Sequence, residues 1–448
     1  MATTSTAAQW TSRLGFILAS AGSAIGIGAI WKFPFWAGAN GGAAFIIPYI
    51  VFSLTIGLSL VMAEIAIGRR GRGSCVSAMR KVGGGKLFAA LGTFAVLTSF
   101  LILSYYSVVG GWCVAYLVDA IRGSVASPDA EGLKAHFADL VSNGYLNVGW
   151  HFAFLAITCG TVVLGVEQGI ERLSKYLMPT LFILMLALIG RSLTLDGAWA
   201  GVEYLFNFKL ENVTSSSILN AMGFTFFSLS LGGGMLITYG SYLKQDVCIP
   251  TASAWVAVLA DMAALLAGLM IMPAVFAFGL EPNGGPGLVF VTVPMIFSHV
   301  PLGSLFAFLF YICLLTAALT SAVSLLEVVV AFMHNEWRFS RRAAVIVSFV
   351  LLFLLGAVSA LSFGVWSGFT VGGRNFFDLL DFVCTNFMMP IGGLAVAALM
   401  GWKAWPAFRE ELSTPRNFGA AVLSCIRFLV AILAPILVLV AVFQGLFG

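Results

Sequence analysis

The sequence predicts an all-α polytopic membrane protein with 11 transmembrane helices. Of its 448 residues, 60% are hydrophobic and only 9% are charged, whereas about 25% are charged in an ordinary soluble domain. The mean hydropathy is +1.00. Because one crossing needs about 20 apolar residues, the length allows roughly 10 to 12 helices. This composition excludes a water-soluble fold, and the net charge of +4 gives no support to nucleic-acid binding.

Apolar runs bounded by charged residues, glycine or proline define the predicted spans. All of them belong to one membrane domain that covers residues 1–448. They are expected at 13–37, 42–69, 87–121, 150–166, 170–191, 218–243, 251–279, 303–333, 343–362, 376–401 and 418–446.

The basic residues predict the orientation of the chain. If the N-terminus is cytoplasmic, 16 of the 23 Lys and Arg residues lie in inside loops or span ends, and five lie outside. This bias follows the positive-inside rule, and eleven crossings then place the C-terminus outside. The apolar stretch after Arg13 has no convincing cleavage site, so we expect a retained helix. The predicted location is the cell inner (plasma) membrane.

Two spans contain glycines and small residues near their middle. The first reads Ala-Gly-Ser-Ala-Ile-Gly-Ile-Gly over 21–28, and the sixth reads Ser-Leu-Ser-Leu-Gly-Gly-Gly over 228–234. Glycine destabilises a helix interior, so we expect both helices to be broken. Such breaks are typical of an inverted five-plus-five repeat with a substrate site at the membrane midplane. The repeats would cover about 13–191 and 218–401, followed by an extra helix at 418–446. The alternative is that the glycines only allow close helix packing.

Short motifs occur in a fixed order through nearly the whole chain. They are Trp10 with 13–18, 22–28, 33–34 and 40–42; Glu64 with 68–69; 105–106; 169–172 with 178–180; 226–232; 287–290 with Pro294; and 319–321. Together these motifs resemble the neurotransmitter:sodium symporter family, in particular its bacterial amino acid transporters such as the leucine transporter. The resemblance implies a secondary transporter without catalytic residues.

A zwitterionic amino acid in a membrane needs donors for its carboxylate and acceptors for its ammonium group, since unpaired charge is costly there. A helix beginning near Gly28 would offer N–H groups to the carboxylate. By resemblance, the Tyr106 hydroxyl would also bind the carboxylate. The ammonium group would bind the carbonyls of Ala24, Phe227 and Ser230, with the Ser228 hydroxyl nearby. By the same resemblance, the pocket for the side chain would be lined by Ile102, Phe227, Gly233, Ser321 and Leu325.

Two glycines bear on the choice of substrate. Gly26 lies where amine transporters of the family carry an aspartate, so the substrate is expected to be an amino acid. Gly233 lies where the leucine transporter carries a phenylalanine. It leaves room for large side chains unless a neighbouring side chain fills the gap. The predicted substrates are hydrophobic, aliphatic or aromatic, L-amino acids.

The resemblance also implies sodium sites, and oxygen ligands suit this hard cation. The second family site is complete, with carbonyls of Gly22, Ile25 and Ala317 and hydroxyls of Thr320 and Ser321. The first site would use Ala24, Ser228 and Asp261, but it lacks one ligand because Ala29 has no side-chain oxygen. We therefore expect one sodium ion at the second site. Asp261 is a possible coupling carboxylate: it could bind sodium, carry a proton, or serve as a structural partner.

Gates are expected on both sides of the substrate. Lys32 and Asp381 match the outer ion pair of the family. On the inner side Trp10 and Tyr242 match packing residues, but Ala7 and Asn335 replace the family's ion pair. We therefore expect a cytoplasmic side that opens more easily.

Other readings of the sequence remain open. A proton-coupled or ion-independent amino acid exchanger could use the same fold. A membrane enzyme or a receptor-like binding protein is a third alternative. The enzyme is disfavoured because the four histidines are scattered without metal-ligand spacing or a paired nucleophile.

Overall fold

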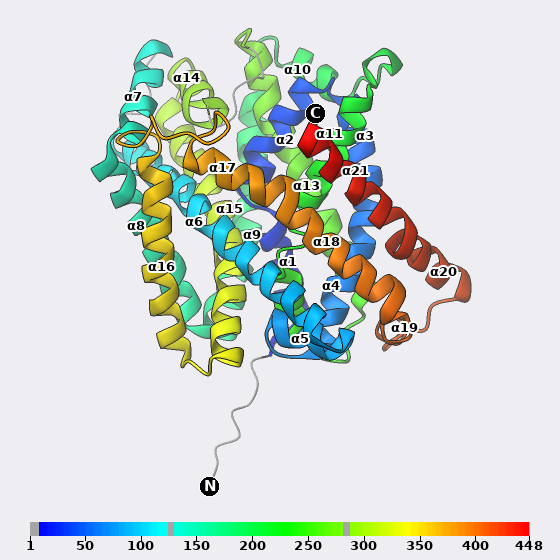
Figure 1. The fold of residues 1–448 in the computed structure, drawn as a ribbon. Coiled ribbons are helices and arrows are strands. Elements are labelled where there is room, and N and C mark those ends of the chain that lie inside the picture. The colour runs from blue at the N-terminus through cyan, green and yellow to red at the C-terminus, as the bar shows by residue number, and fades with distance from the viewer. Residues whose placement is uncertain (1–8, 124–129, 281–286, 448) are drawn as a thin grey trace.

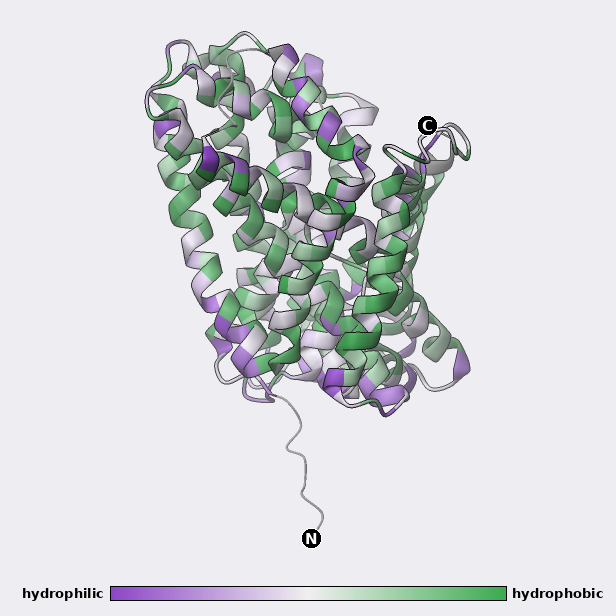
Figure 2. Ribbon diagram, turned by 90° about the vertical axis from the view of Figure 1, so that its left-hand side faces the viewer, coloured by the Kyte–Doolittle hydropathy of each residue, from purple (hydrophilic) through white to green (hydrophobic). Residues whose placement is uncertain are grey.

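The computed structural model describes residues 9–123, 130–280 and 287–447. These residues form helices and connecting loops, and their only β-pairing is an isolated bridge between Val371 and Arg374. Figure 1 shows long helices running between two ends of the molecule, with α5 and α19 at one end and α7, α10 and α14 at the other. Hydrophobic residues dominate the helices between the ends, while hydrophilic residues gather at the ends (Figure 2). The predicted all-α membrane fold is confirmed.

The long helices begin and end within a few residues of the predicted spans. They are α1 (Arg13–Ala24) with α2 (Ile27–Ala39); α3 (Ala43–Phe52), η1 (Ser53–Gly57) and α4 (Leu58–Gly71); α6 (Lys86–Arg122); α8 (Gly144–Val163); η2 (Val166–Glu171) with α9 (Arg172–Leu193); α11 (Ser215–Ser228) with α12 (Met235–Ser241); α13 (Ile249–Ala277); α15 (Gly303–Glu336); α16 (Arg341–Leu361); α17 (Phe376–Val383), η5 (Cys384–Met388), α18 (Met389–Ala398) and η6 (Leu399–Lys403); and α20 (Ala420–Phe428), η7 (Leu429–Leu433) and α21 (Ala434–Phe447). Shorter helices connect them: α5 (Cys75–Gly83), α7 (Ala130–Ser142), α10 (Ala198–Phe206), η3 (Leu210–Asn212), η4 (Leu288–Thr292), α14 (Val293–Ser298) and α19 (Trp405–Leu412).

Over the described ranges, nine helices are long and apolar enough to cross a membrane, and the pair α1 and α2, bent by 50°, makes a tenth. The remaining predicted span holds α11 and α12, which have 14 and 7 residues. Each is too short to cross a bilayer alone. The count of eleven crossings and the inverted repeat stay predictions.

Both predicted breaks are present. The first lies at Ile25 and Gly26, and the second spans the six residues between Ser228 and Met235. In the second break Ser230, Gly232 and Gly234 have φ values of +54°, +83° and +79°. This left-handed conformation is accessible to glycine at little cost. The glycines therefore let the chain leave the helix and expose backbone groups inside the bundle.

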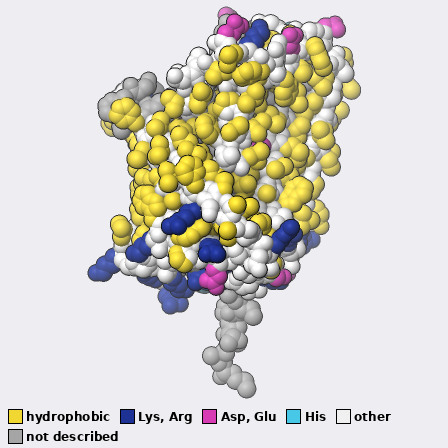
Figure 3. Space-filling model, turned by 90° about the vertical axis from the view of Figure 1, so that its right-hand side faces the viewer, with side chains coloured by type: hydrophobic (Ala, Val, Ile, Leu, Met, Phe, Trp, Pro, Cys, Tyr) yellow, Lys and Arg dark blue, Asp and Glu magenta, His cyan; other side chains and the backbone are white. Residues whose placement is uncertain are grey.

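Lysine and arginine side chains gather toward the lower end of the face shown in Figure 3. This is the end that carries α5 and α19 (Figure 1). Arg69 is fully buried there and binds Glu411 of α19, with 2.5 Å between Nε and Oε2. The charge distribution agrees with the predicted cytoplasmic end, while the orientation itself stays a prediction.

Candidate functional site

A cavity of about 210 Å³ lies at the two broken spans. It is lined by residues of α1, α2, α6, α11, α12, α15, α17, α18 and the two breaks. Eight of the ten residues predicted to bind substrate line it: Ala24, Gly28, Ile102, Tyr106, Phe227, Ser230, Ser321 and Leu325. The structure thus brings together residues that are up to 301 positions apart in the sequence.

One wall of the cavity is the N-terminus of α2, which begins at Ile27, one residue before the expected start. The first N–H groups of a helix have no partner within the helix and carry a partial positive charge. The Ile27 N–H donates to the Tyr106 hydroxyl at 3.1 Å. A side chain on Gly28 would overlap the Phe227 ring, so glycine here lets that ring cover the helix end. This wall can bind an anionic group.

The site also contains hydrogen-bond acceptors, which are backbone carbonyls at the two helix breaks. The Ala24 carbonyl accepts from the Gly26 N–H at 3.1 Å, and the Phe227 carbonyl accepts from the Ser230 N–H at 3.1 Å. The Ser230 hydroxyl donates to the Ser23 carbonyl at 2.9 Å, which joins the two broken spans. Because a carbonyl oxygen has two lone pairs, the Ala24 carbonyl retains capacity to accept from a cationic ligand, whereas the Phe227 carbonyl also accepts from the Leu229 N–H.

Gly26 stands in a crowded place between α1 and α2. A methyl group built there would lie 2.6 Å from the Ser321 hydroxyl and 2.9 Å from the Tyr106 hydroxyl. An aspartate at this position would therefore require both side chains to move. The geometry of the site is built around the absence of that carboxylate.

Two of the predicted substrate residues do not line the cavity. The Ser228 hydroxyl accepts from the Tyr49 hydroxyl at 3.2 Å and donates to the Thr225 carbonyl at 3.3 Å, so it faces its neighbours on α3 and α11. Gly233 is covered by Met235, whose sulfur lies 2.7 Å from where a methyl group on Gly233 would be. The gap at this glycine is thus filled by a neighbouring side chain, as the sequence analysis allowed.

Several lining residues were missed from the sequence. They are, among others, Tyr105, Val109, Met235, Phe377 and Met389. Val109 could have been found, because helix positions 102, 106 and 109 face one side. Met235 gave no such signal, because it follows three glycines outside any helical period.

Four of the five residues predicted for the second sodium site, Gly22, Ala317, Thr320 and Ser321, lie together between α1 and α15, and Ile25 ends α1. The Ser321 hydroxyl is 3.3 Å from the Gly22 carbonyl and 2.8 Å from the Ser23 carbonyl. The Thr320 hydroxyl donates to the Ala317 carbonyl at 3.1 Å. A methyl group on Gly22 would lie 3.0 Å from Thr320 Cβ, so these two helices are in close contact. The oxygen atoms present fit a hard monovalent cation.

Asp261 of α13 lies in a buried polar cluster with α3 and η1. Its Oδ1 accepts from the Ser53 hydroxyl at 2.7 Å, and Tyr49 lies close enough to bond it. Tyr49 also reaches Ser228, so two predicted ligands of the first sodium site are connected. Among the described residues, Asp261 Oδ2 is buried without a hydrogen-bond partner. An unpaired carboxylate oxygen in a membrane interior is costly unless a cation or proton satisfies it.

Comparisons with known proteins bear on this site. The sequence model of the Sodium:neurotransmitter symporter family matches residues 7–131 and 130–447. An uncharacterized sodium-dependent transporter of Bacillus subtilis (strain 168), YhdH, is 38% identical over 441 residues, 98% of each chain. One of Haemophilus influenzae is 33% identical over 451 residues, again 98% of each. The crystal structure of MhsT in complex with L-phenylalanine matches with a TM-score of 0.91 and 42% identity, over 98% of this chain and 100% of that one.

The chain belongs to the sodium:neurotransmitter symporter family. It is therefore a sodium-dependent membrane transporter, and its family consists of secondary transporters and not of enzymes. The family predicted from the motifs is confirmed. The roles of individual site residues stay predictions.

The transporter has an ion pair on the side of the cavity that is predicted to face outward. Lys32 Nζ lies 3.2 Å and 3.4 Å from the two carboxylate oxygens of Asp381 and 4.3 Å from the centre of the Phe227 ring. Tyr105 and Thr385 also donate to Asp381, at 3.1 Å and 3.2 Å. Lys32, Phe227 and Asp381 also line a second, outer cavity. These side chains line both cavities, and their role as an outer gate stays a prediction.

The side of the transporter that is predicted to face inward is held by aromatic packing and by an ion pair between a buried glutamate and a partly exposed arginine. Trp10 Nε1 donates to the Tyr239 carbonyl at 2.9 Å. The Tyr242 hydroxyl donates to Glu327 of α15 at 2.8 Å, and Glu327 pairs with Arg341 at 2.5 Å. The sequence analysis missed Glu327 and Arg341. They tie the C-terminal end of α12 to the body of α15 and to the first residue of α16.

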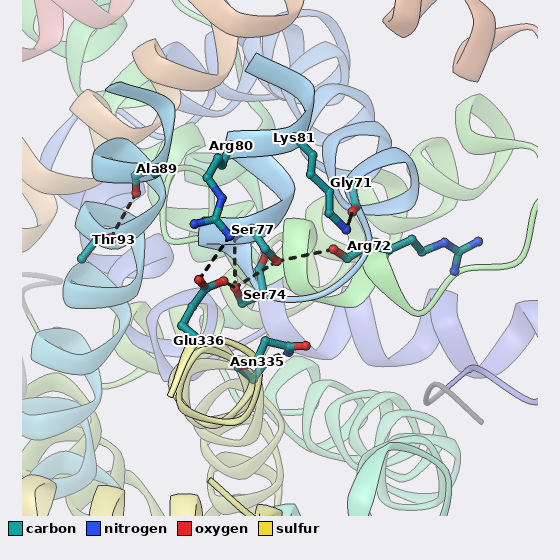
Figure 4. Close-up of polar contacts among 11 residues, drawn as sticks. Gly71, Arg72, Ser74, Ser77, Arg80, Lys81, Ala89, Thr93, Asn335 and Glu336 are labelled. Atoms are coloured by element: carbon teal, nitrogen blue, oxygen red, sulfur yellow. Dashed lines mark hydrogen bonds and ion pairs between the residues drawn. The ribbon is translucent and has the colours of Figure 1, made fainter. Parts of the chain in front are cut away.

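A second polar cluster joins α5 to the end of α15 (Figure 4). Glu336 accepts from the Ser74 hydroxyl at 2.8 Å and pairs with Arg80 at 3.4 Å. Its neighbour Asn335 bonds only its own helix, at the Ala331 carbonyl, among the contacts of the described residues. Ala7, the other member of the replaced family pair, lies outside the described residues. The easier opening of this side stays a prediction. The contacts of Glu327 and Glu336 would oppose such opening.

Proposed function

We propose that this transporter imports hydrophobic L-amino acids by alternating access, driven by a sodium gradient across the plasma membrane. One observation carries the proposal. The cavity has a helix N-terminus and the Tyr106 hydroxyl at one wall, free carbonyl capacity at Ala24, and mostly apolar side chains over the rest. This arrangement complements a carboxylate, an ammonium group and an apolar side chain at once. The crystal structure of the related MhsT holds L-phenylalanine.

The crowding at Gly26 supports an amino acid over a monoamine. A monoamine lacks a carboxylate, so it would leave the N-terminus of α2 without an anionic partner. It would also need a protein carboxylate for its ammonium group, and at Gly26 the space for one is closed by the Tyr106 and Ser321 hydroxyls. The carboxylates that line the cavity, Asp378 and Asp381, belong to α17. Both effects disfavour amines.

Sodium would enter this cycle at the second site, bound by carbonyls of Gly22, Ile25 and Ala317 and by the hydroxyls of Thr320 and Ser321. Binding there would hold α1 against α15 and so favour the form in which the Lys32–Asp381 side is closed. A first-site ion would use Ala24 and Ser228 near Asp261. The alternative, proton coupling, is favoured by Asp261 Oδ2, which has no hydrogen-bond partner among the described residues, and by Ala29, which supplies no side-chain ligand.

The substrate class is tested by competition against uptake of labelled leucine into proteoliposomes. Phenylalanine, tryptophan and methionine are expected to compete, whereas glutamate, lysine and a monoamine such as tryptamine are not. Tryptamine is the matched control for tryptophan, because it lacks only the carboxylate. Equal competition by the two would contradict the assignment of α2 and Tyr106 to the carboxylate.

A further inference from the structure

Three basic residues, Lys86, Lys403 and Arg427, are exposed near the end of the molecule that carries α5 and α19. Lys86 is the first residue of α6, Lys403 is the last residue of η6, and Arg427 lies in the last turn of α20. None of the three pairs with a carboxylate of the described residues, whereas Arg70 and Arg80 at the same end each bind a glutamate. Lys86, Lys403 and Arg427, here called the basic cluster, therefore carry positive charge that the described part of the chain does not neutralise.

Aromatic rings hold two of these cations in place. Lys403 Nζ lies 4.9 Å from the centre of the Phe88 ring. Arg427 Cζ lies 5.3 Å from the centre of the Trp405 ring, and Trp405 is only two residues after Lys403. A ring attracts a cation but leaves its N–H groups available. Among the described residues, the Lys403 ammonium makes one hydrogen bond, to the Gly84 carbonyl at 3.4 Å, and the Arg427 guanidinium makes none. Both cations thus lie beside one short segment with donors free for an anion.

The basic cluster borders an apolar surface of the transporter. Arg427 belongs to the span Ala420–Val440, in which Phe428 and Ile432 are 51% and 50% exposed. Trp402, which is 60% exposed, donates Nε1 to the Ala431 carbonyl at 2.7 Å, and exposed tryptophan is typical of a membrane interface. An unpaired arginine on a lipid-facing span is costly, and its long side chain can reach toward the headgroups. The missing partner of Arg427 is therefore to be sought at the level of the lipid headgroups.

We propose that the basic cluster binds the headgroup of one anionic phospholipid in the adjacent leaflet, which is predicted to be the cytoplasmic one. The phosphate accepts hydrogen bonds from Lys403 and Arg427, Lys86 adds positive charge, and the acyl chains lie along Phe428 and Ile432. Hydrophobic side chains cover the surface above the lysine and arginine side chains in Figure 3. This surface favours a lipid over a soluble anion, because free phosphate has no acyl chain to bury there. The site is independent of the proposed substrate and coupling ion.

The test titrates the purified full-length protein in detergent with dioctanoyl phosphatidylglycerol, which is anionic, and with dioctanoyl phosphatidylcholine, which is zwitterionic. Native mass spectrometry gives the dissociation constant of the first lipid bound. One Lys or Arg near a membrane surface contributes about fivefold to the binding of anionic lipid. Wild type is therefore expected to bind phosphatidylglycerol at least about tenfold more tightly than phosphatidylcholine. Lys403→Gln and Arg427→Gln are each expected to weaken phosphatidylglycerol about fivefold, and the double variant about 25-fold, without weakening phosphatidylcholine.

Arg409→Gln with Arg416→Gln is the matched control. Both arginines are exposed, on α19 and shortly after it, and neither pairs with a carboxylate or lies over a ring in the described part of the chain. This double variant removes the same charge and is expected to leave the dissociation constant of phosphatidylglycerol within about twofold of wild type. If the double variant of Lys403 and Arg427 does not fold, the single variants replace it.

Three results would overturn the proposal. Equal weakening by the two double variants would show that any basic residues at this end suffice. Equal binding of phosphatidylglycerol and phosphatidylcholine by wild type would exclude recognition of the anionic headgroup. Displacement of phosphatidylglycerol by millimolar inorganic phosphate would identify a soluble anion, and not a lipid, as the ligand.

Discussion

The ion pair between Lys32 and Asp381 gives the sharpest prediction about gating. Asp381→Asn keeps the shape of the side chain and removes its charge. Lys32 Nζ lies 3.2 Å from Oδ1, and the two side chains are 19% and 34% exposed. Exposed ion pairs contribute up to about 1 kcal/mol, and hydrogen bonds to charged groups about 1.5–3 kcal/mol. For this partly exposed pair, we expect Asp381→Asn to reduce the stability of the closed outer gate by about 1–2 kcal/mol.

Such a loss shifts the ratio of closed to open outer gates by about 5- to 30-fold, since 1.4 kcal/mol corresponds to tenfold. The assay is the labelling rate of Ile102→Cys, inside the cavity, by a charged thiol reagent added from outside. Cys248 and Cys425, the native cysteines that are not buried, are replaced by serine in all variants. Labelling of Asp381→Asn is expected to be faster by the same 5- to 30-fold.

Asp378→Asn is the matched control, because Asp378 lines the same cavity from the same helix and makes no ion pair with Lys32 among the described contacts. It makes the same change of charge and is expected to leave the labelling rate within about twofold of the parent. Equal acceleration by both variants would refute the reasoning, since the effect would then be one of local charge and not of the gate.

Three further predictions concern the inner side, sodium and the outer surface. Glu327→Gln leaves its arginine partner unpaired, which costs up to about 3 kcal/mol for a buried pair. A cysteine introduced by Ser241→Cys is therefore expected to react faster with a thiol reagent added from the cytoplasmic side. An unchanged rate would exclude an inner-gate role for Glu327. Thr320→Val is expected to raise the sodium concentration for half-maximal uptake at least tenfold, which is the lower end of the loss of metal affinity caused by changes near a bound ion. The control Thr316→Val, one turn earlier, is not expected to raise it. Equal effects of the two variants would argue against the second sodium site. A hydrogen-bonded aspartate of α6 raises the pKa of His136 on α7. The contribution of this pair to stability is therefore full below the ordinary histidine pKa of about 6.5 and is lost as the pH rises through the higher pKa of the folded state. The difference in melting temperature between wild type and His136→Gln should disappear at alkaline pH. A difference that stays constant with pH would contradict this.

Features set by local chemistry could be predicted from the sequence. The spans follow from apolar runs, and the breaks at Gly26 and 232–234 follow from glycines, which need no tertiary information to interrupt a helix. Tyr106 and Ile102, by contrast, were predicted from the family resemblance and not from local chemistry.

Features set by contacts between distant helices could not be predicted. Glu327 and Arg341 are 14 residues apart on two helices joined by a turn, and no periodic pattern indicates that they meet. Ser228 was predicted beside the substrate, but its hydroxyl faces Tyr49 because α3 packs on α11. Met235 follows a glycine run, where the direction of the next side chain depends on φ angles that the sequence does not specify.

The central claim is that sodium drives the uptake of a hydrophobic amino acid. The most direct measurement is accumulation of labelled leucine in proteoliposomes under an inward sodium gradient, with choline replacing sodium in parallel and with imposed pH gradients. The account predicts accumulation above the external concentration only with sodium, and loss of that accumulation when the gradient is dissipated. Equal accumulation in choline under a pH gradient would contradict sodium coupling and would move the coupling role to Asp261.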